Sequence, residues 1–350
     1  MIKAYFQKRT LQFCLPAATS RGIMKDKPVW YLFLYDDKLS QVTGIGEYSF
    51  IPGLSVDVGE KINEKLTETC DLINKGEYDF EKPVYGFPGL NFALETAILD
   101  LKSNGTKVLF PSEFTNGKKG IPVNGLIWMA SPENMLEQVE DKINKGFRCI
   151  KLKIGAIGFK DELSIIRNIR RRFTSNELEI RVDANGAYNT LSVFDVLEML
   201  AELQVHSVEQ PIMPSQIDEM ALLCKNSPVP IALDEELLGI CPFENKRKLI
   251  ETIRPHYLVL KPGLLGGFQE TGEWIKIAAE FNAGWWVTSA LESNIGLNAI
   301  SQWTYTLENN MYQGLGTGSL YSSNIGSPLE VHGEELYYNV HKKWNYEFIY

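Results

Sequence analysis

The sequence contains no apolar run of the roughly 18 residues that a membrane-spanning helix needs. Its basic stretch "RNIRRRF" is expected to be a solvated helix face. Its first stretch, "MIKAYFQKRTLQFCLP", alternates polar and apolar residues and lacks the continuous apolar segment of a secretory signal. The net charge of −9 disfavours nucleic acid or an anionic membrane as a partner. We therefore expect a cytoplasmic protein that acts on a small molecule and has neither a nucleic-acid nor a membrane partner.

Cysteine and histidine are also scarce. The five cysteines are scattered and form no C-x-x-C pair, which disfavours a disulfide framework or a zinc site and suits a reducing compartment. Because there are only four histidines, any acid–base chemistry is expected to rest on other residues. The glycines of "KPGLLGGF" do not form a dinucleotide fingerprint, and no phosphate-binding G-x-x-x-x-G-K-[ST] loop occurs.

The pattern along the chain divides it into two parts. Three apolar strands followed by helical patterns near residues 57–76 and 88–103 predict an α+β unit over residues 1–118. Residues 119–319 alternate short apolar strands with helices about eight times, which favours a TIM-like (β/α) barrel, although a doubly wound sheet gives the same alternation. We assign residues 320–350 to the first unit, which they complete.

Charged or polar side chains stand near the ends of six successive predicted strands, about 25 to 30 residues apart: Lys153, Asp183, Glu209, Asp234, Lys261 and Ser289. In a barrel, the C-terminal ends of all strands meet at one face, so these side chains should converge on one pocket. Three carboxylates in a partly desolvated pocket repel one another and imply a bound cation. Ligands that offer only oxygen favour Mg²⁺ before Mn²⁺.

Lys151 and Lys153 lie in the apolar strand "RCIKLKIG" and share one face of it, because side chains alternate along a strand. We expect both lysines to face the barrel mouth. A divalent ion and partial burial are predicted to lower the pKa of a lysine there and let it act as a base. Taken alone, a K-x-K strand is more often a solvated edge and "DANG" is more often a turn. Their regular placement on successive strands favours a site.

The segments "KLKIG", "RVDANGAY", "VEQPI", "ALDEEL" and "LVLKPGLLGG" together resemble the enolase superfamily, in its muconate-lactonizing branch. The resemblance implies a (β/α)7β barrel with an N-terminal capping domain, and small carboxylates as substrates. The metal ligands that it implies are Asp183, Glu209 and Asp234. It also implies an acid/base role for Lys153, with Lys261 on the opposite face of the substrate. The supporting residues that it implies are Lys151 beside Lys153, and Arg181 and Asn185 near the metal.

Within this branch, "TSRGIM", "SALESNIG" and "GLGTGSLY" resemble the o-succinylbenzoate synthase family. Those enzymes are Mg²⁺-dependent lyases of menaquinone biosynthesis that form 2-succinylbenzoate by dehydration through an enediolate. The resemblance implies that Ser289 and Ser293 bind the succinyl carboxylate and that Arg21 helps to close the site. An N-acylamino acid racemase or a dipeptide epimerase shares the same core motifs, and a non-catalytic binding barrel is the alternative from another class. The oligomeric state stays open, with a homo-oligomer among the options.

Overall fold

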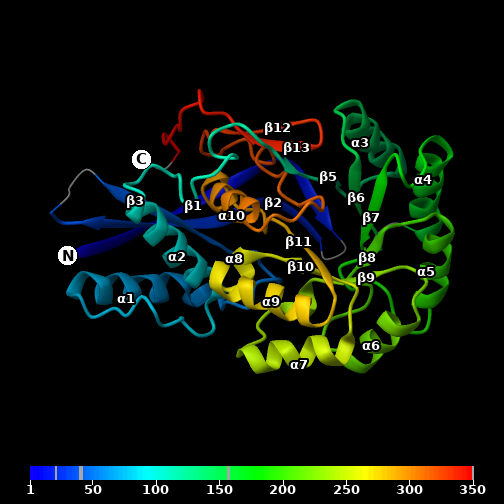
Figure 1. Ribbon diagram of the computed structural model, residues 1–350, viewed down its shortest axis with the longest axis horizontal. Helices are drawn as coiled ribbons and strands as arrows, with labels where there is room; N and C mark the ends of the chain where they lie inside the picture. The colour runs from blue at the N-terminus through cyan, green and yellow to red at the C-terminus, as the bar shows by residue number, and fades with distance from the viewer. Residues whose placement is uncertain (20–21, 39–41, 156–157, 349–350) are drawn as a thin grey trace.

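The computed structural model describes residues 1–19, 22–38, 42–155 and 158–348. An antiparallel sheet with two helices, coloured blue to cyan, lies beside a curled parallel sheet with its own helices, coloured green to yellow (Figure 1). This arrangement agrees with the predicted barrel and its N-terminal α+β unit. Across the described residues, no helix combines the length and apolar character that crossing a bilayer requires.

The N-terminal unit is built on a sheet of order β1-β2-β3, in which both neighbouring pairs are antiparallel. Its elements are β1 (Ile2–Thr19), β2 (Gly22–Asp36), β3 (Thr43–Ser49), η1 (Gly59–Lys61), α1 (Ile62–Lys75) and α2 (Pro88–Lys102). Side chains of β2 alternate between the two faces: Leu32 packs in the cluster formed with α1 and α2, whereas Tyr31 and Phe33 pack with Ile295 of the other unit. Both faces of β2 are therefore buried, which explains its continuous apolar run.

The second unit contains seven parallel strands in the order β11-β10-β9-β8-β7-β6-β5. These strands are β5 (Gly125–Ile127), β6 (Cys149–Lys153), β7 (Glu179–Asp183), β8 (Ser207–Glu209), β9 (Ile231–Leu233), β10 (Tyr257–Leu260) and β11 (Gly284–Val287). The helices around them are α3 (Pro132–Asn144), α4 (Phe159–Arg172), α5 (Val193–Glu202), α6 (Ile217–Asn226), α7 (Phe243–Ile253), α8 (Pro262–Leu265), α9 (Phe268–Glu280) and α10 (Asn294–Thr306), with the 3-10 turn η2 (Glu235–Leu237) after β9.

An irregular segment near residue 313 joins the two edge strands, where the sequence predicts a weak eighth strand. Gln313 forms a parallel bridge with Val123 on one side, and Gly314 forms one with Thr288 on the other. Backbone hydrogen bonds support both joints: Gln313 N donates to the Pro122 oxygen at 2.8 Å, and Gly314 N to the Val287 oxygen at 2.8 Å. The parallel sheet is closed into a barrel by these short bridges instead of by a regular strand.

The C-terminal part of the chain contacts both units. The strands β4 (Ile121–Pro122), β12 (Leu329–His332) and β13 (Glu335–Tyr338) form a small sheet of order β12-β13-β4. Cys14 N in β1 donates a hydrogen bond to the Leu320 oxygen at 2.8 Å. That residues 320–350 complete the N-terminal unit stays a prediction, because β13 also pairs with β4 of the second unit.

Candidate active site

Three carboxylates meet at the C-terminal ends of neighbouring strands. Asp183 ends β7, Glu209 ends β8 and Asp234 directly follows β9, and Asp183 and Glu209 are paired in the sheet register. One oxygen of each carboxylate lies within 4.8 Å of the corresponding oxygens of the other two, and all three side chains are buried. Oδ1 of Asp234 has no hydrogen-bond partner among the described residues. A buried set of oxygen donors at this spacing fits a divalent cation.

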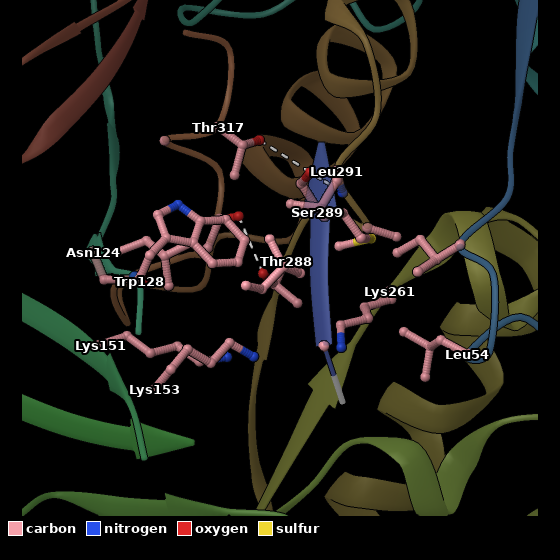
Figure 2. Close-up of a pocket in the computed structure, with 18 of the residues that line it drawn as sticks. Leu54, Asn124, Trp128, Lys151, Lys153, Lys261, Thr288, Ser289, Leu291 and Thr317 are labelled. Carbon is pink, nitrogen blue, oxygen red and sulfur yellow. Dashed lines mark hydrogen bonds between the residues drawn. The ribbon is translucent and has the colours of Figure 1, made fainter. Parts of the chain in front are cut away.

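Lysines approach this acidic triad from two sides. Lys151 and Lys153 extend from β6, and Lys261, which follows β10, extends toward them from across the cavity (Figure 2). Nζ of Lys153 lies 2.6 Å from Oδ2 of Asp183, and Nζ of Lys151 lies 2.6 Å from Oε2 of Glu209. Lys261 forms an ion pair with Asp234. The structure thus brings together all five residues that the sequence assigns to the metal and to catalysis.

The charges of the triad raise the pKa of Lys151 and of Lys261. Burial disfavours the ammonium of Lys151, but Asp183 and Glu209 outweigh burial and raise its pKa above the ordinary value. Burial acts on Lys261 in the same way, and Asp234 raises its pKa overall. The lowered lysine pKa predicted from the sequence requires a bound divalent ion and stays a prediction; without the ion, each of these two ammonium groups is paired with a carboxylate.

Two polar side chains order the edges of the site. Oδ1 of Asn185 accepts a hydrogen bond from Nζ of Lys153 at 2.9 Å, and its Nδ2 donates to Oε1 of Glu235 at 2.9 Å. Oε1 of Gln210 accepts from the backbone N–H of Asp234 at 3.2 Å. Asn185 lies where the sequence predicts it. Gln210 was missed, although it directly follows Glu209 in "VEQP", where a polar residue at a strand end is the available signal.

Arg181 lies deeper in the barrel than the sequence analysis suggests. Its Nε donates to Oε1 of Glu179 at 2.6 Å, and one of its terminal nitrogens donates to the backbone carbonyl oxygen of Tyr312 at 2.9 Å. Its guanidinium lies 4.2 Å from the ring centre of Trp286. None of the contacts found within the described part of the chain joins Arg181 to the acidic triad. Its effect on Asp183, two positions along the same strand, would be exerted through the position of β7.

A cavity of about 220 Å³ opens above the lysines. Lys151, Lys153 and Lys261 form its base, and its walls come from both units (Figure 2). The apolar wall residues include Met24, Ile51, Leu54, Trp128 and Leu291, and the polar ones include Asn124, Thr288, Ser289 and Thr317. Oγ1 of Thr317 donates to Oγ of Ser289 at 3.0 Å. A charged base with a half-apolar wall suits an organic carboxylate of modest size.

Several wall residues were not singled out from the sequence. Asn124 and Trp128 lie on the predicted strand "VNGLIWM" and share a face with Leu126, so period-two alternation was a signal for them. Thr317 lies in "GLGTGSLY", which was noted only as a resemblance. Met24 and Leu54 come from the N-terminal unit, and no local pattern shows that they reach the barrel mouth.

One expected substrate contact, Ser293, is not found at the cavity. Ser293 does not line it: its backbone N–H and its hydroxyl both donate to the carboxylate of Glu47, and its Oγ accepts from Ile295 N as the N-cap of α10. The expected contact between Ser293 and a substrate carboxylate is therefore not supported, because the hydroxyl of Ser293 donates its hydrogen bond to Glu47. Arg21 lies outside the described residues, whereas Ser289 lines the cavity as predicted.

Known proteins resemble this chain in sequence and in fold. Residues 134–340 match the family described as enolase C-terminal domain-like. An o-succinylbenzoate synthase from Desulfotalea psychrophila is 45% identical over 94% of this chain and 96% of that protein. An N-succinyl-L-Arg/Lys racemase from Bacillus cereus is 31% identical over 49% of each chain.

Solved structures agree with these relationships. The crystal structure of MenC from Desulfotalea psychrophila has a TM-score of 0.83 at 40% identity, and covers 96% of this chain and 99% of that one. A muconate lactonizing enzyme from Pseudomonas fluorescens has a TM-score of 0.81 at 20% identity, covers 100% of this chain and 97% of that one, and supports the fold alone.

Proposed function

This chain belongs to the enolase C-terminal domain-like family, and we propose that it is a lyase that catalyses the o-succinylbenzoate synthase reaction. The reaction removes water from 2-succinyl-6-hydroxy-2,4-cyclohexadiene-1-carboxylate and yields 2-succinylbenzoate. One observation carries the proposal: Lys153 and Lys261 approach one carboxylate triad from opposite sides, in a chain that is 45% identical to an o-succinylbenzoate synthase.

Asp183, Glu209 and Asp234 would hold a divalent ion, and we propose Mg²⁺, with Mn²⁺ as a substitute. When bound, the ion supplies positive charge that stabilises the negative charge formed beside the substrate carboxylate. Oδ2 of Asp183 lies 2.8 Å from Nζ of Lys151 and 2.6 Å from Nζ of Lys153. A cation held by Asp183 would compete with both ammonium groups, which favours their neutral form and makes Lys153 available as a base.

In the proposed mechanism, Lys153 takes the proton from the ring carbon that bears the carboxylate. The same Nζ then returns this proton to the hydroxyl on the adjacent carbon, so that water leaves and the ring becomes aromatic. Lys261 faces the opposite side of the substrate and stabilises the enediolate by its charge. Lys151 supports Lys153 because both lysines share Asp183.

The succinyl arm is placed in the upper part of the cavity. Ser289 and Thr317 offer hydroxyl groups for its carboxylate, and Leu291 and Trp128 offer apolar contact for the ring and chain. A cytoplasmic location and a role in menaquinone biosynthesis complete the proposal.

A second candidate activity is racemisation of N-succinylamino acids. The opposed lysines favour it, because one can remove a proton from a carbon and the other can return one to the opposite face. The intact triad and lysines argue against the alternative of a purely binding barrel.

The test is an ultraviolet assay of purified protein with the cyclohexadiene substrate and Mg²⁺, in which loss of the diene absorbance is followed. We expect rapid turnover that falls to background with excess EDTA and returns with Mg²⁺. Turnover that persists in chelator would contradict the metal assignment. A folded, Mg²⁺-loaded sample that leaves the diene unchanged but racemises N-succinylamino acids would favour the second activity.

A further inference from the structure

A second group of buried charges lies outside the cavity, between the N-terminal sheet and the barrel. It consists of Lys27 on β2, Glu47 on β3 and Glu292 just before α10, and we call it the junction cluster. All three residues have 0% of their surface exposed. The proposed reaction uses none of them, yet buried charges are costly unless they hold a specific partner.

Glu47 binds the start of α10 across the interface between the two units. Its Oε1 accepts from Ser293 N at 2.8 Å, and its Oε2 accepts from the Ser293 hydroxyl at 2.6 Å and from Gly296 N at 2.8 Å. A carboxylate is favoured at a helix N-terminus, where backbone N–H groups point outward unpaired. Glu47 therefore fixes the C-terminal end of the loop that runs from β11 to α10.

Lys27 acts on the same loop through a hydroxyl relay. Nζ of Lys27 donates to Oγ of Ser49 at 2.5 Å, and Oγ of Ser49 donates to the Ala290 oxygen at 3.3 Å. Ala290 lines the cavity between Ser289 and Leu291. This relay links β2 and β3 to the backbone at the middle of the cavity wall.

Glu292 fills the space behind this wall. A Cβ atom added to Gly263 would lie 2.4 Å from Oε1 of Glu292, and one added to Gly296 would lie 2.7 Å from its Cγ. Gly263 is the second residue after Lys261. Glu292 thus packs between the turn that follows Lys261 and the first turn of α10, and it does not line the cavity.

We propose that Lys27, Ser49 and Glu47 are positioning residues that hold Ser289, Ala290 and Leu291 in place and so set the affinity for the succinyl arm of the substrate. None of the three lines the cavity. This inference rests on the proposed function for the identity of the ligand, but not for the position of the loop. The chemical step, which occurs at Lys153 on the other side of the cavity, should be affected much less.

The experiment compares Lys27→Met and Ser49→Ala with wild type. Steady-state kinetics with the cyclohexadiene substrate gives kcat and KM, and calorimetry with Mg²⁺ gives the Kd of 2-succinylbenzoate. We expect KM and Kd to rise about tenfold, the effect of losing one hydrogen bond, while kcat stays within about threefold. Ser49→Ala removes only a hydroxyl and serves as the milder variant if Lys27→Met does not fold.

Lys107→Met is the matched control. Lys107 is also a buried lysine, and its Nζ pairs with Asp100 at 2.6 Å, but it does not line the cavity. This variant should lose stability and keep the wild-type KM. An equal rise of KM in Lys107→Met would show general loosening of the fold and would overturn the proposal.

Hydrogen–deuterium exchange of the backbone amides in residues 289–296 separates this inference from the proposed function. We expect faster exchange there in Lys27→Met and Ser49→Ala and no change in Lys107→Met. If wild type neither converts the diene nor binds 2-succinylbenzoate, the proposed function fails, and exchange alone decides whether the relay positions the loop. A Ser49→Ala protein with wild-type exchange and wild-type KM would overturn the positioning role.

Discussion

The barrel mouth and the junction cluster both bury lysines among carboxylates, but they satisfy these charges differently. At the mouth, Lys153 and Asp183 are paired directly at 2.6 Å, beside a cavity. At the junction, Lys27 donates to a serine hydroxyl and Glu47 accepts from a serine and from backbone N–H groups. Among the described residues, no ion pair within 4.0 Å joins Lys27 to Glu47 or Glu292.

This difference separates charges that can change partner from charges that cannot. A lysine paired with a carboxylate beside a cavity can release it when a cation or a substrate enters. A carboxylate that accepts backbone N–H groups at a helix start is committed to that backbone, since its loss leaves buried donors unpaired. We expect substitutions at the mouth to change chemistry with little effect on folding, and substitutions at the junction to change stability and loop position first.

The largest expected effect is that of Lys153→Ala. Loss of the proposed acid/base should reduce kcat for dehydration by about 10³-fold or more. The fold should persist, because Asp183 keeps an ion pair with Lys151 at 2.8 Å. The diene assay measures the rate, and thermal unfolding by circular dichroism checks the fold. A folded variant with near wild-type turnover would show that a residue other than Lys153 is the base. The lysines of the barrel mouth would then not differ from Lys27 of the junction cluster in their role.

Lys261→Ala should have the next largest effect. Because Lys261 is proposed to stabilise charge in the dehydration, we expect a loss of about 10²-fold in kcat. Any racemase activity should disappear, since that reaction needs a second proton carrier on the opposite face. The two assays on one preparation distinguish these roles. Equal losses in both reactions would mean that Lys261 is also a proton carrier in the dehydration.

The sequence predicted the mouth well because its residues obey a local rule. Each strand of the barrel ends at the same face, so one polar residue per strand end, such as Asp183 or Lys261, could be found by spacing alone. The alternation of "CIKLK" likewise predicted that the two lysines share one face. In the structure both line the cavity, whereas Ile150 and Leu152 lie in the hydrophobic core.

The junction could not be predicted, because it depends on contacts between distant segments. Glu47 and Ser293 are 246 positions apart, and neither lies in a pattern that marks the other as its partner. Ser293 was assigned to the substrate because it lies near Ser289 in the same motif, whereas the fold turns it toward Glu47. Near Gln313 the sequence predicted a weak eighth strand, but it could not show that two isolated bridges replace a regular strand there.

Glu292→Gln tests whether burial in the junction cluster raises the pKa of the Glu292 carboxyl. Burial, with added repulsion from Glu47 and opposed by Lys27, raises the pKa of Glu292 from 4.5 to about 7. The folded protein therefore holds this proton more tightly than the unfolded chain, so stability falls as pH rises from about 4.5 to 7. Above pH 7 the full cost is present, on the order of 3 kcal/mol. Glu292→Gln removes that charge and should be more stable than wild type at pH 8.5, but not at pH 5.

Urea unfolding at the two pH values measures this difference. Glu113→Gln is the control at an exposed site, where a hydrogen bond from Lys119 lowers the pKa of the carboxyl. Because this stabilisation is lost only below about pH 4.5, Glu113→Gln should be slightly less stable than wild type at both pH values, with almost no difference between them. A Glu292→Gln variant whose stability relative to wild type is the same at both pH values would show that Glu292 does not titrate in this range.

The smallest expected effect concerns the place where the two regions meet, the hydroxyl pair of Ser289 and Thr317. Oγ1 of Thr317 donates to Oγ of Ser289 at 3.0 Å, which orients the serine toward the cavity. Thr317→Val keeps the shape of the side chain and removes this donor, so KM for the diene should rise about three- to fivefold with kcat unchanged. Thr106→Val, at an exposed hydroxyl, is the control and should leave both constants at wild-type values. If Thr317→Val lowers kcat instead of raising KM, then Ser289 contributes to the chemical step, and the division between a reactive base and a positioning wall does not hold.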